Sequence, residues 1–153
     1  MRSSWWTVVC RWTAAAGGAG WVPVAPGTAG SAVGLLLVVW VGPDPLKSGW
    51  LILATTLVAL LTISTAERSF GTPDARQIVI DEVVGMAITL WSVPHRWPML
   101  GVGFLLFRVM DVLKPPPLRW LERLRTPWGV LLDDVGAGVY ARLLLQAWLR
   151  WAP

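Results

Sequence analysis

The stretch from Trp50 to Ala66, WLILATTLVALLTISTA, contains no charged side chain and decides the fold class. A helix needs about 20 apolar residues to cross the hydrocarbon core of a bilayer, and this run comes close to that length. Four further apolar segments accompany it, at about Ser31–Val41, Val83–Val93, Met99–Leu113 and Gly129–Leu149. The sequence therefore predicts an all-α, polytopic transmembrane bundle of about four to five short membrane helices.

The composition of the whole chain agrees with a membrane protein. Of its 153 residues, 55% are hydrophobic and 14% are charged, and the mean hydropathy is +0.58; a soluble domain usually carries about 25% charged residues. Twelve tryptophans are present, and this residue prefers the membrane–water interface. No basic stripe is interleaved with stacking aromatics, which excludes nucleic acid as a partner. The partner that the composition favours is the lipid bilayer.

The chain is short enough to be a single domain over residues 1–153. We expect residues 1–21 to form an N-terminal interfacial or re-entrant segment, and residues 22–149 to form the helical core. A weak likeness to a signal peptide is the alternative for the N-terminus, although Arg11 interrupts its apolar run early. Several core segments are shorter than a spanning helix, so the segment Val83–Val93 could also be a buried helix that does not cross the bilayer. The sequence gives no indication of oligomeric state.

Basic residues and tryptophans predict an orientation. Most basic side chains lie before the first apolar segment, between the second and third, or after the fourth, and the positive-inside bias places them in the cytoplasm. The pair Trp40 and Trp50 and the pair Trp91 and Trp97 flank the two other connections, which we assign to the outer interface. This orientation assigns one end of each helix to the cytoplasmic face of the membrane and the other end to the outer face.

Five of the nine carboxylates lie at the ends of apolar segments or inside them, and this orientation places all five at the cytoplasmic ends of the last three segments. They are Asp81, Glu82, Asp111, Asp133 and Asp134. Charges in or near the bilayer are costly, and mutual repulsion adds to that cost. A hard divalent cation such as Mg²⁺ compensates directly, because it prefers oxygen ligands, and five carboxylates suffice for one or two ions. The alternative is that they form buried ion pairs with Arg108, Lys114 or Arg142.

Two further patterns suit a phosphate group. Arg108 and Lys114 flank Asp111 on the fourth segment, and two cations beside a metal site match the charge of a phosphate monoester; the alternative is a pair that reaches to the interface. Thr28 and Ser31 lie in the turn Pro26–Ser31 before the first apolar helix, where a helix N-terminus can bind an anion or a hydroxyl can simply cap it.

Three glycines predict close helix packing. Gly85 lies one turn after Asp81, and Gly138 lies one turn after Asp134, with Gly136 nearby. Small residues allow membrane helices to approach closely. We therefore interpret these glycines as packing positions that bring the acidic residues together.

With these residues in place, the chain resembles the phosphatidylglycerophosphatase A family of bacterial inner membranes. The resemblance is carried by Ala25–Ser31, Ile80–Met86, Phe107–Asp111 with Lys114-Pro115, and Asp133-Asp134 with Gly136 and Gly138. It implies a multi-pass, Mg²⁺-dependent phosphoric monoester hydrolase that converts phosphatidylglycerophosphate to phosphatidylglycerol at the cytoplasmic face. Carried over, the five acids would be the metal ligands, and Thr28, Ser31, Arg108 and Lys114 would contact the substrate phosphate. Catalytic roles would fall to Asp81, Glu82, Asp111 and Asp134.

Other functions remain as alternatives. A broader lipid phosphatase acting on phosphatidic acid would use the same chemistry. A headgroup transferase is disfavoured because its usual aspartate spacing is missing, and a histidine-based phosphatase because His95 is the sole histidine and falls on the predicted outer side. A cation transporter would place acids near the bilayer midplane and show paired repeats, neither of which the sequence predicts. Within the hydrolase interpretation, Glu82 or Asp134 could act as base, and an aspartate nucleophile is also possible.

Overall fold

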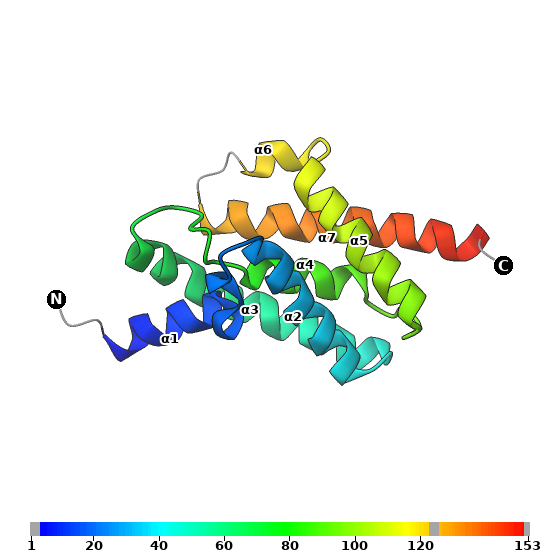
Figure 1. Cartoon of the computed structure of the whole chain (residues 1–153), viewed down its shortest axis with the longest axis horizontal. Coiled ribbons are helices and arrows are strands. Elements are labelled where there is room, and N and C mark those ends of the chain that lie inside the picture. Colours follow the sequence, from blue (N-terminus) through cyan, green and yellow to red (C-terminus); the bar gives the residue numbers. More distant parts are fainter. Residues whose placement is uncertain (1–3, 123–125, 152–153) are drawn as a thin grey trace.

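The computed structural model describes residues 4–122 and 126–151. Within them the chain forms eight helical segments and no strand, which confirms the all-α prediction (Figure 1). In chain order they are α1 (Trp5–Ala14), the 3₁₀ helix η1 (Ala16–Trp21), α2 (Pro26–Val41), α3 (Pro45–Phe70), α4 (Ile80–Thr89), α5 (Trp97–Leu113), α6 (Leu118–Glu122) and α7 (Pro127–Trp151).

The helices begin and end where local chemistry sets their limits. The Asp44 carboxylate caps α3 by accepting hydrogen bonds from the amides of Leu46 and Lys47, at 2.8 and 3.0 Å. Gly71 ends the same helix in the left-handed conformation, with φ = 80°, as glycine does at many helix C-termini. Prolines in the first turns of α2 and α5 also favour helix starts at these positions. These caps explain why α2, α3 and α5 begin before the predicted apolar segments, whereas α4 ends at Thr89, before the predicted limit at Val93.

The short helix α4 lies at the centre of the bundle, between α2 and α7. On the α2 side, a Cβ added to Gly30 would lie 2.7 Å from Cβ of Val79, and one added to Gly34 would lie 2.8 Å from Cβ of Met86. On the α7 side, a Cβ added to Gly138 would lie 2.5 Å from the carbonyl oxygen of Gly85. Both neighbours thus contact α4 through glycines, and ten residues of helix span only about 15 Å. The third apolar segment therefore forms a buried helix, which was the second of the two possibilities that the sequence left open for it.

Successive core helices run in opposite directions, so their ends form two clusters. The starts of α2, α4 and α7 lie at the same end of the bundle as the last turns of α3 and α5, because residues from all of these turns line one cavity. At the other end, the indole of Trp91 donates a hydrogen bond to the carbonyl of Pro45, at 3.0 Å. The two connections that we assigned to one face of the membrane therefore do lie together.

Among the described helices, α3 is the one long and apolar enough to cross a bilayer by length and composition. The helices α2 and α5 measure about 24–26 Å at 1.5 Å per residue, and α7 is interrupted by charged side chains. The number of membrane crossings therefore stays a prediction.

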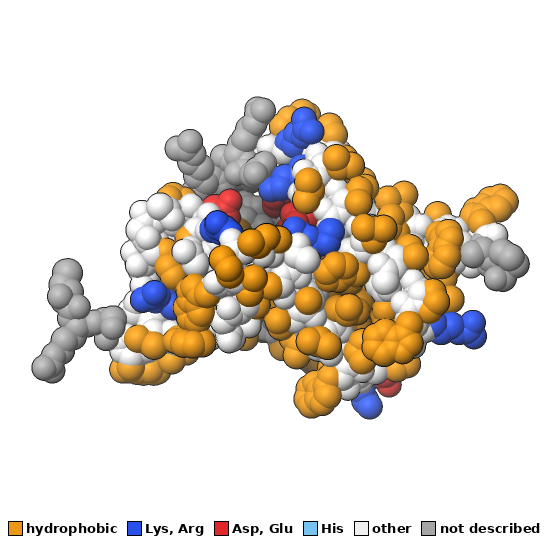
Figure 2. Space-filling view, viewed as in Figure 1, with side chains coloured by type: hydrophobic (Ala, Val, Ile, Leu, Met, Phe, Trp, Pro, Cys, Tyr) orange, Lys and Arg blue, Asp and Glu red, His pale blue; other side chains and the backbone are white. Residues whose placement is uncertain are grey.

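The N-terminal segment docks on the bundle as helix α1 followed by η1. Cys10 and Ala14 are fully buried, and the Arg11 guanidinium lies 5.0 Å from the ring centroid of Phe70 on α3. Trp5 and Trp12 on the same helix stay exposed. Large apolar side chains cover much of the face seen in Figure 2 as well. This surface agrees with a lipid environment for both the helical core and its N-terminal helix.

Candidate active site

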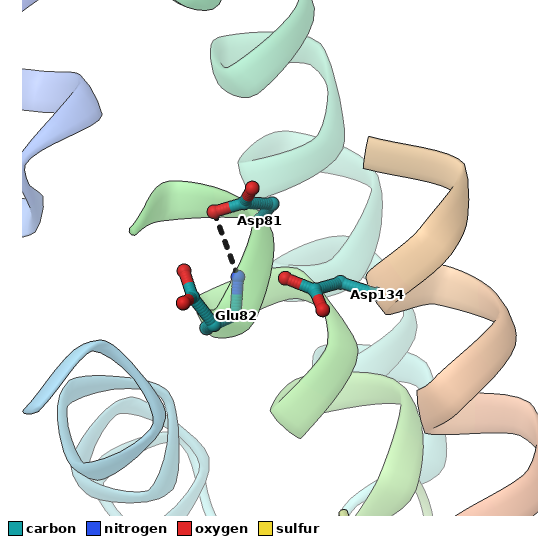
Figure 3. Close-up of side chains that lie close together, drawn as sticks. All are labelled: Asp81, Glu82 and Asp134. Carbon is teal, nitrogen blue, oxygen red and sulfur yellow. Dashed lines mark hydrogen bonds between the residues drawn. The ribbon is translucent and has the colours of Figure 1, made fainter. Parts of the chain in front are cut away.

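The first turn of α4 and the second turn of α7 bring three carboxylates together. One carboxylate oxygen from each of Asp81, Glu82 and Asp134 lies within 4.8 Å of the others. Figure 3 shows the three side chains pointing toward one another from the two helices. Asp81 and Asp134 are each only 5% exposed, and the Glu82 amide donates to Oδ1 of Asp81 at 3.1 Å. We call these residues the carboxylate triad.

Glycine contacts set the distance between the two helices that carry the triad. A Cβ added to Gly85 would lie 2.6 Å from the backbone oxygen of Asp134, and Gly138 meets Gly85 in turn. The predicted packing role of these two glycines is confirmed. Gly136 differs, because it faces the side chain of Leu118 on α6 rather than α4.

Burial and repulsion perturb the acids at the start of α4. Loss of water, followed by the negative charge of Asp134, raises the pKa of Glu82 to about 8. Loss of water, followed by the neighbouring Glu82, raises the pKa of Asp81 well above its ordinary value. In addition, Oε2 of Glu82 is buried and has no hydrogen-bond partner among the described residues. A bound cation would favour the deprotonated acids, because it compensates the negative charge that burial and repulsion make costly.

The other two predicted acids form ion pairs with the two predicted cations. Nη1 of Arg108 lies 2.5 Å from Oδ2 of Asp111, and Nζ of Lys114 lies 2.5 Å from Oδ2 of Asp133. The second pair connects the end of α5 to the start of α7, and Lys114 adopts the left-handed conformation, with φ = 45°. The ion-pair alternative therefore describes two of the five acids, while the other three form the triad.

The N-terminus of α2 lies against this charged cluster. A Cβ on Gly27 would collide with Oε1 of Glu82 and would lie 3.2 Å from Nη1 of Arg108. Ser31 donates its hydroxyl hydrogen to the carbonyl of Gly27 at 2.8 Å and accepts a hydrogen bond from Arg108 at 3.4 Å. Thr28 does not line the cavity and makes no side-chain hydrogen bond to any described residue. Of the two predicted hydroxyls, only Ser31 contacts the cluster.

All five acids, together with Arg108 and Lys114, line one cavity of about 680 Å³. Figure 2 shows acidic and basic side chains gathered around a hollow in a mostly apolar face. The same wall includes residues that the sequence analysis missed, namely Glu67, Asp74, Arg76 and Thr126. The Asp74 amide donates to Oε1 of Glu67 at 2.8 Å, which joins the end of α3 to the following connection. His95 is not among the described lining residues.

The family model described as phosphatidylglycerophosphatase A matches residues 12–149. The chain belongs to this family. Membership makes it a lipid phosphatase, and it confirms the resemblance found in the motifs of α2, α4, α5 and α7.

Three similar proteins are named as phosphatases, and their names differ in the substrate. The chain is 36% identical to phosphatidylglycerophosphatase A of Escherichia coli over 132 residues, which is 84% of this chain and 76% of that protein. It is 35% identical to phosphatidylglycerophosphatase A of Haemophilus influenzae over 139 residues, or 88% of this chain and 85% of that protein. It is 38% identical over 145 residues to a Bacteroides thetaiotaomicron protein provisionally named phosphatidylinositol-3-phosphatase, covering 88% and 89% of the two chains. No solved structure matches this chain significantly.

Proposed function

We propose that this protein is a Mg²⁺-dependent phosphatase that removes the terminal phosphate of phosphatidylglycerophosphate and releases phosphatidylglycerol. The observation that carries the proposal is the carboxylate triad, held by two glycine-packed helices in a cavity that also contains Arg108 and Lys114. Two family members with similar sequences carry this activity in their names.

The triad fits a hard divalent cation. Its donors are all carboxylate oxygens that lie close enough to share one ion, and Oε2 of Glu82 is buried with no hydrogen-bond partner in the part of the chain that the structure describes. Mg²⁺ binds through a few carboxylates, waters and substrate phosphate oxygens, so Asp81, Glu82 and Asp134 would hold it. When bound, such an ion polarises the phosphoryl group and lowers the pKa of a coordinated water.

The chain's own residues supply the remaining tasks. Arg108 can bind a phosphoryl oxygen while its contacts with Asp111 and Ser31 fix the direction of the guanidinium. The ion pair of Lys114 with Asp133 keeps a cation at the cavity and holds α5 to α7. We assign to Glu82 or Asp134 the task of accepting the proton of the attacking water. In this scheme Asp111 and Asp133 act by positioning the two cations, although the sequence analysis made them metal ligands.

The fold also suits a substrate that stays in the bilayer. The cavity opens at the end of the bundle that we assign to the cytoplasmic face of the bacterial inner membrane, and apolar side chains surround it. The acyl chains can therefore remain in lipid while the headgroup enters between the starts of α2, α4 and α7. We propose a multi-pass arrangement in which α4 stays inside the protein.

Phosphate release by the purified protein in mixed micelles tests the proposal. Phosphatidylglycerophosphate, phosphatidylinositol 3-phosphate and phosphatidic acid are compared as substrates, each with Mg²⁺ and with a chelator. We expect the highest kcat/KM with phosphatidylglycerophosphate and loss of activity on chelation. Faster hydrolysis of phosphatidylinositol 3-phosphate would favour the activity named for the Bacteroides relative. Faster hydrolysis of phosphatidic acid would favour a broader lipid phosphatase, and cation transport in liposomes without hydrolysis would favour a transporter.

A further inference from the structure

Acidic side chains outnumber basic ones among the described residues that line the cavity. Its described lining residues include seven carboxylates and three cations, Arg76, Arg108 and Lys114. Arg108 and Lys114 lie 2.5 Å from Asp111 and Asp133, respectively. Arg76 has no carboxylate within ion-pair distance among the described residues, and its guanidinium donates to the backbone carbonyl of Pro23. Arg76 thus brings a positive charge to the cavity that no described carboxylate neutralises.

The position of Arg76 links the charge to the place where a headgroup enters. The residue lies in the connection between α3 and α4, five residues before Asp81, and its side chain is exposed. Pro23 precedes the start of α2, whose residues Ala25 to Gly27 line the same cavity. The hydrogen bond to Pro23 therefore holds the guanidinium at the rim of the cavity beside the N-terminus of α2.

We propose that Arg76 binds the phosphodiester of the lipid substrate and so selects lipids that carry a diester in addition to the phosphate to be removed. The inference rests on the proposed function. Phosphatidylglycerophosphate carries a terminal monoester and a diester that joins the headgroup to diacylglycerol, whereas phosphatidic acid has a monoester alone. A diester anion that enters a cavity with excess negative charge needs a cation of its own. A guanidinium can give two parallel hydrogen bonds to a phosphate, and one bond to Pro23 leaves further donors available.

The kinetics of Arg76→Gln test this assignment. In mixed micelles with Mg²⁺, we expect kcat/KM for phosphatidylglycerophosphate to fall about 10–100-fold, mainly through KM, because a charge-assisted hydrogen bond is lost. The kcat/KM for phosphatidic acid should stay within about twofold of wild type. Arg76→Lys should recover part of the loss, since it restores the charge without the planar fork. The matched control is Arg68→Gln, because Arg68 lies in the last turn of α3, donates to the carbonyl of Ser64 and does not line the cavity.

Binding of the product separates the role of Arg76 from catalysis. Phosphatidylglycerol retains the diester and lacks the monoester, so short-chain phosphatidylglycerol should be a competitive inhibitor of the wild-type protein. Its inhibition constant should be about tenfold higher for Arg76→Gln. An equal loss of activity on both substrates, or unchanged inhibition by phosphatidylglycerol, would overturn the assignment. If wild type hydrolyses neither lipid, the proposed function fails, and a tryptophan-fluorescence titration with short-chain phosphatidylglycerol still decides the binding role. Equal affinity of the two proteins in that titration would overturn it.

Discussion

A Cβ atom on Gly138 of α7 would lie 2.5 Å from the carbonyl oxygen of Gly85 on α4. This distance is too short for any real contact, and the obstacle is backbone, which cannot rotate away. The two glycines therefore fix how closely Asp134 approaches the acids of α4. The packing of the bundle and the geometry of the carboxylate triad depend on the same contact.

Replacement of Gly138 by alanine should separate the two helices. We expect Gly138→Ala to lower the free energy of unfolding by about 1–3 kcal/mol, as overpacking does elsewhere, and to reduce phosphatase activity at least about tenfold. Thermal unfolding and phosphate release in detergent measure the two effects. Gly101→Ala is the matched control: Gly101 lies on α5 with no atom within 4 Å of an added Cβ, so helix propensity should keep or raise its stability. Equal behaviour of the two variants would contradict the packing role.

Asp134→Asn should remove most of the activity and weaken Mg²⁺ binding. The change keeps the size of the side chain but removes one of the three carboxylates from the triad. Because residues behind metal ligands already contribute about 10–100-fold, we expect at least a 100-fold loss of kcat/KM. Phosphate release and Mg²⁺ titration calorimetry measure it. Asp44→Asn is the control, since Asp44 caps α3 away from the cavity and asparagine caps helices equally well. Full activity of Asp134→Asn would remove this residue from the site.

The raised pKa of Glu82 predicts that Mg²⁺ binding depends on pH. Without a cation, folded protein releases the Glu82 proton near pH 8, whereas an unperturbed glutamate releases it near 4.5. Between these values the folded state binds more protons than the unfolded state, so the stability of metal-free protein should fall as pH rises. Mg²⁺ displaces the proton, so its apparent affinity should rise from about pH 6 to about pH 8. Calorimetry in buffers of different ionisation enthalpy should detect the release of protons when Mg²⁺ binds. A Mg²⁺ affinity that does not change with pH, together with no proton release, would contradict this prediction.

Arg108→Lys should retain charge yet lose activity. Nη1 of Arg108 contacts both Asp111 and Ser31, and a lysine ammonium cannot reproduce the planar fork that makes these contacts while facing a phosphate. We expect kcat/KM to fall about 10–100-fold, the range for charged hydrogen bonds. Ser31→Ala removes one of the two contacts and should cost about threefold to tenfold. Thr28→Val, which alters a hydroxyl outside the cavity, should behave like wild type in the same assay.

The sequence predicted the helical fold and the identity of the charged cluster, because both follow from local patterns. Apolar runs without charge mark helices, and acids at the ends of such runs are costly unless a positive charge compensates them, so the sequence indicates that Asp81 and Asp134 share one site. The division among the acids did not follow from sequence. Asp133 and Asp134 are neighbours on one helix, and only the direction of each side chain makes one a partner of Lys114 and the other a member of the triad.

The wall of the cavity beyond the motifs was also not predictable. Glu67 lies in the last turn of α3, and Asp74 and Arg76 lie in the irregular connection that follows it. No periodic pattern in this part of the sequence indicates which way their side chains face. Their placement depends on long-range contacts, such as the hydrogen bond between Arg76 and Pro23. The sequence can show that a charged residue lies next to a motif, but only the tertiary structure shows which way its side chain points.

The burial of α4 between two glycine-bearing neighbours has a consequence for how this enzyme can diverge. A helix that is enclosed on both flanks tolerates few side-chain changes, and its first turn carries Asp81 and Glu82 of the carboxylate triad. Relatives with new substrate preferences should therefore differ in the connection before α4 and around the cavity rim, while α4 itself changes little. Directed evolution toward another headgroup would gain most from libraries at those rim positions.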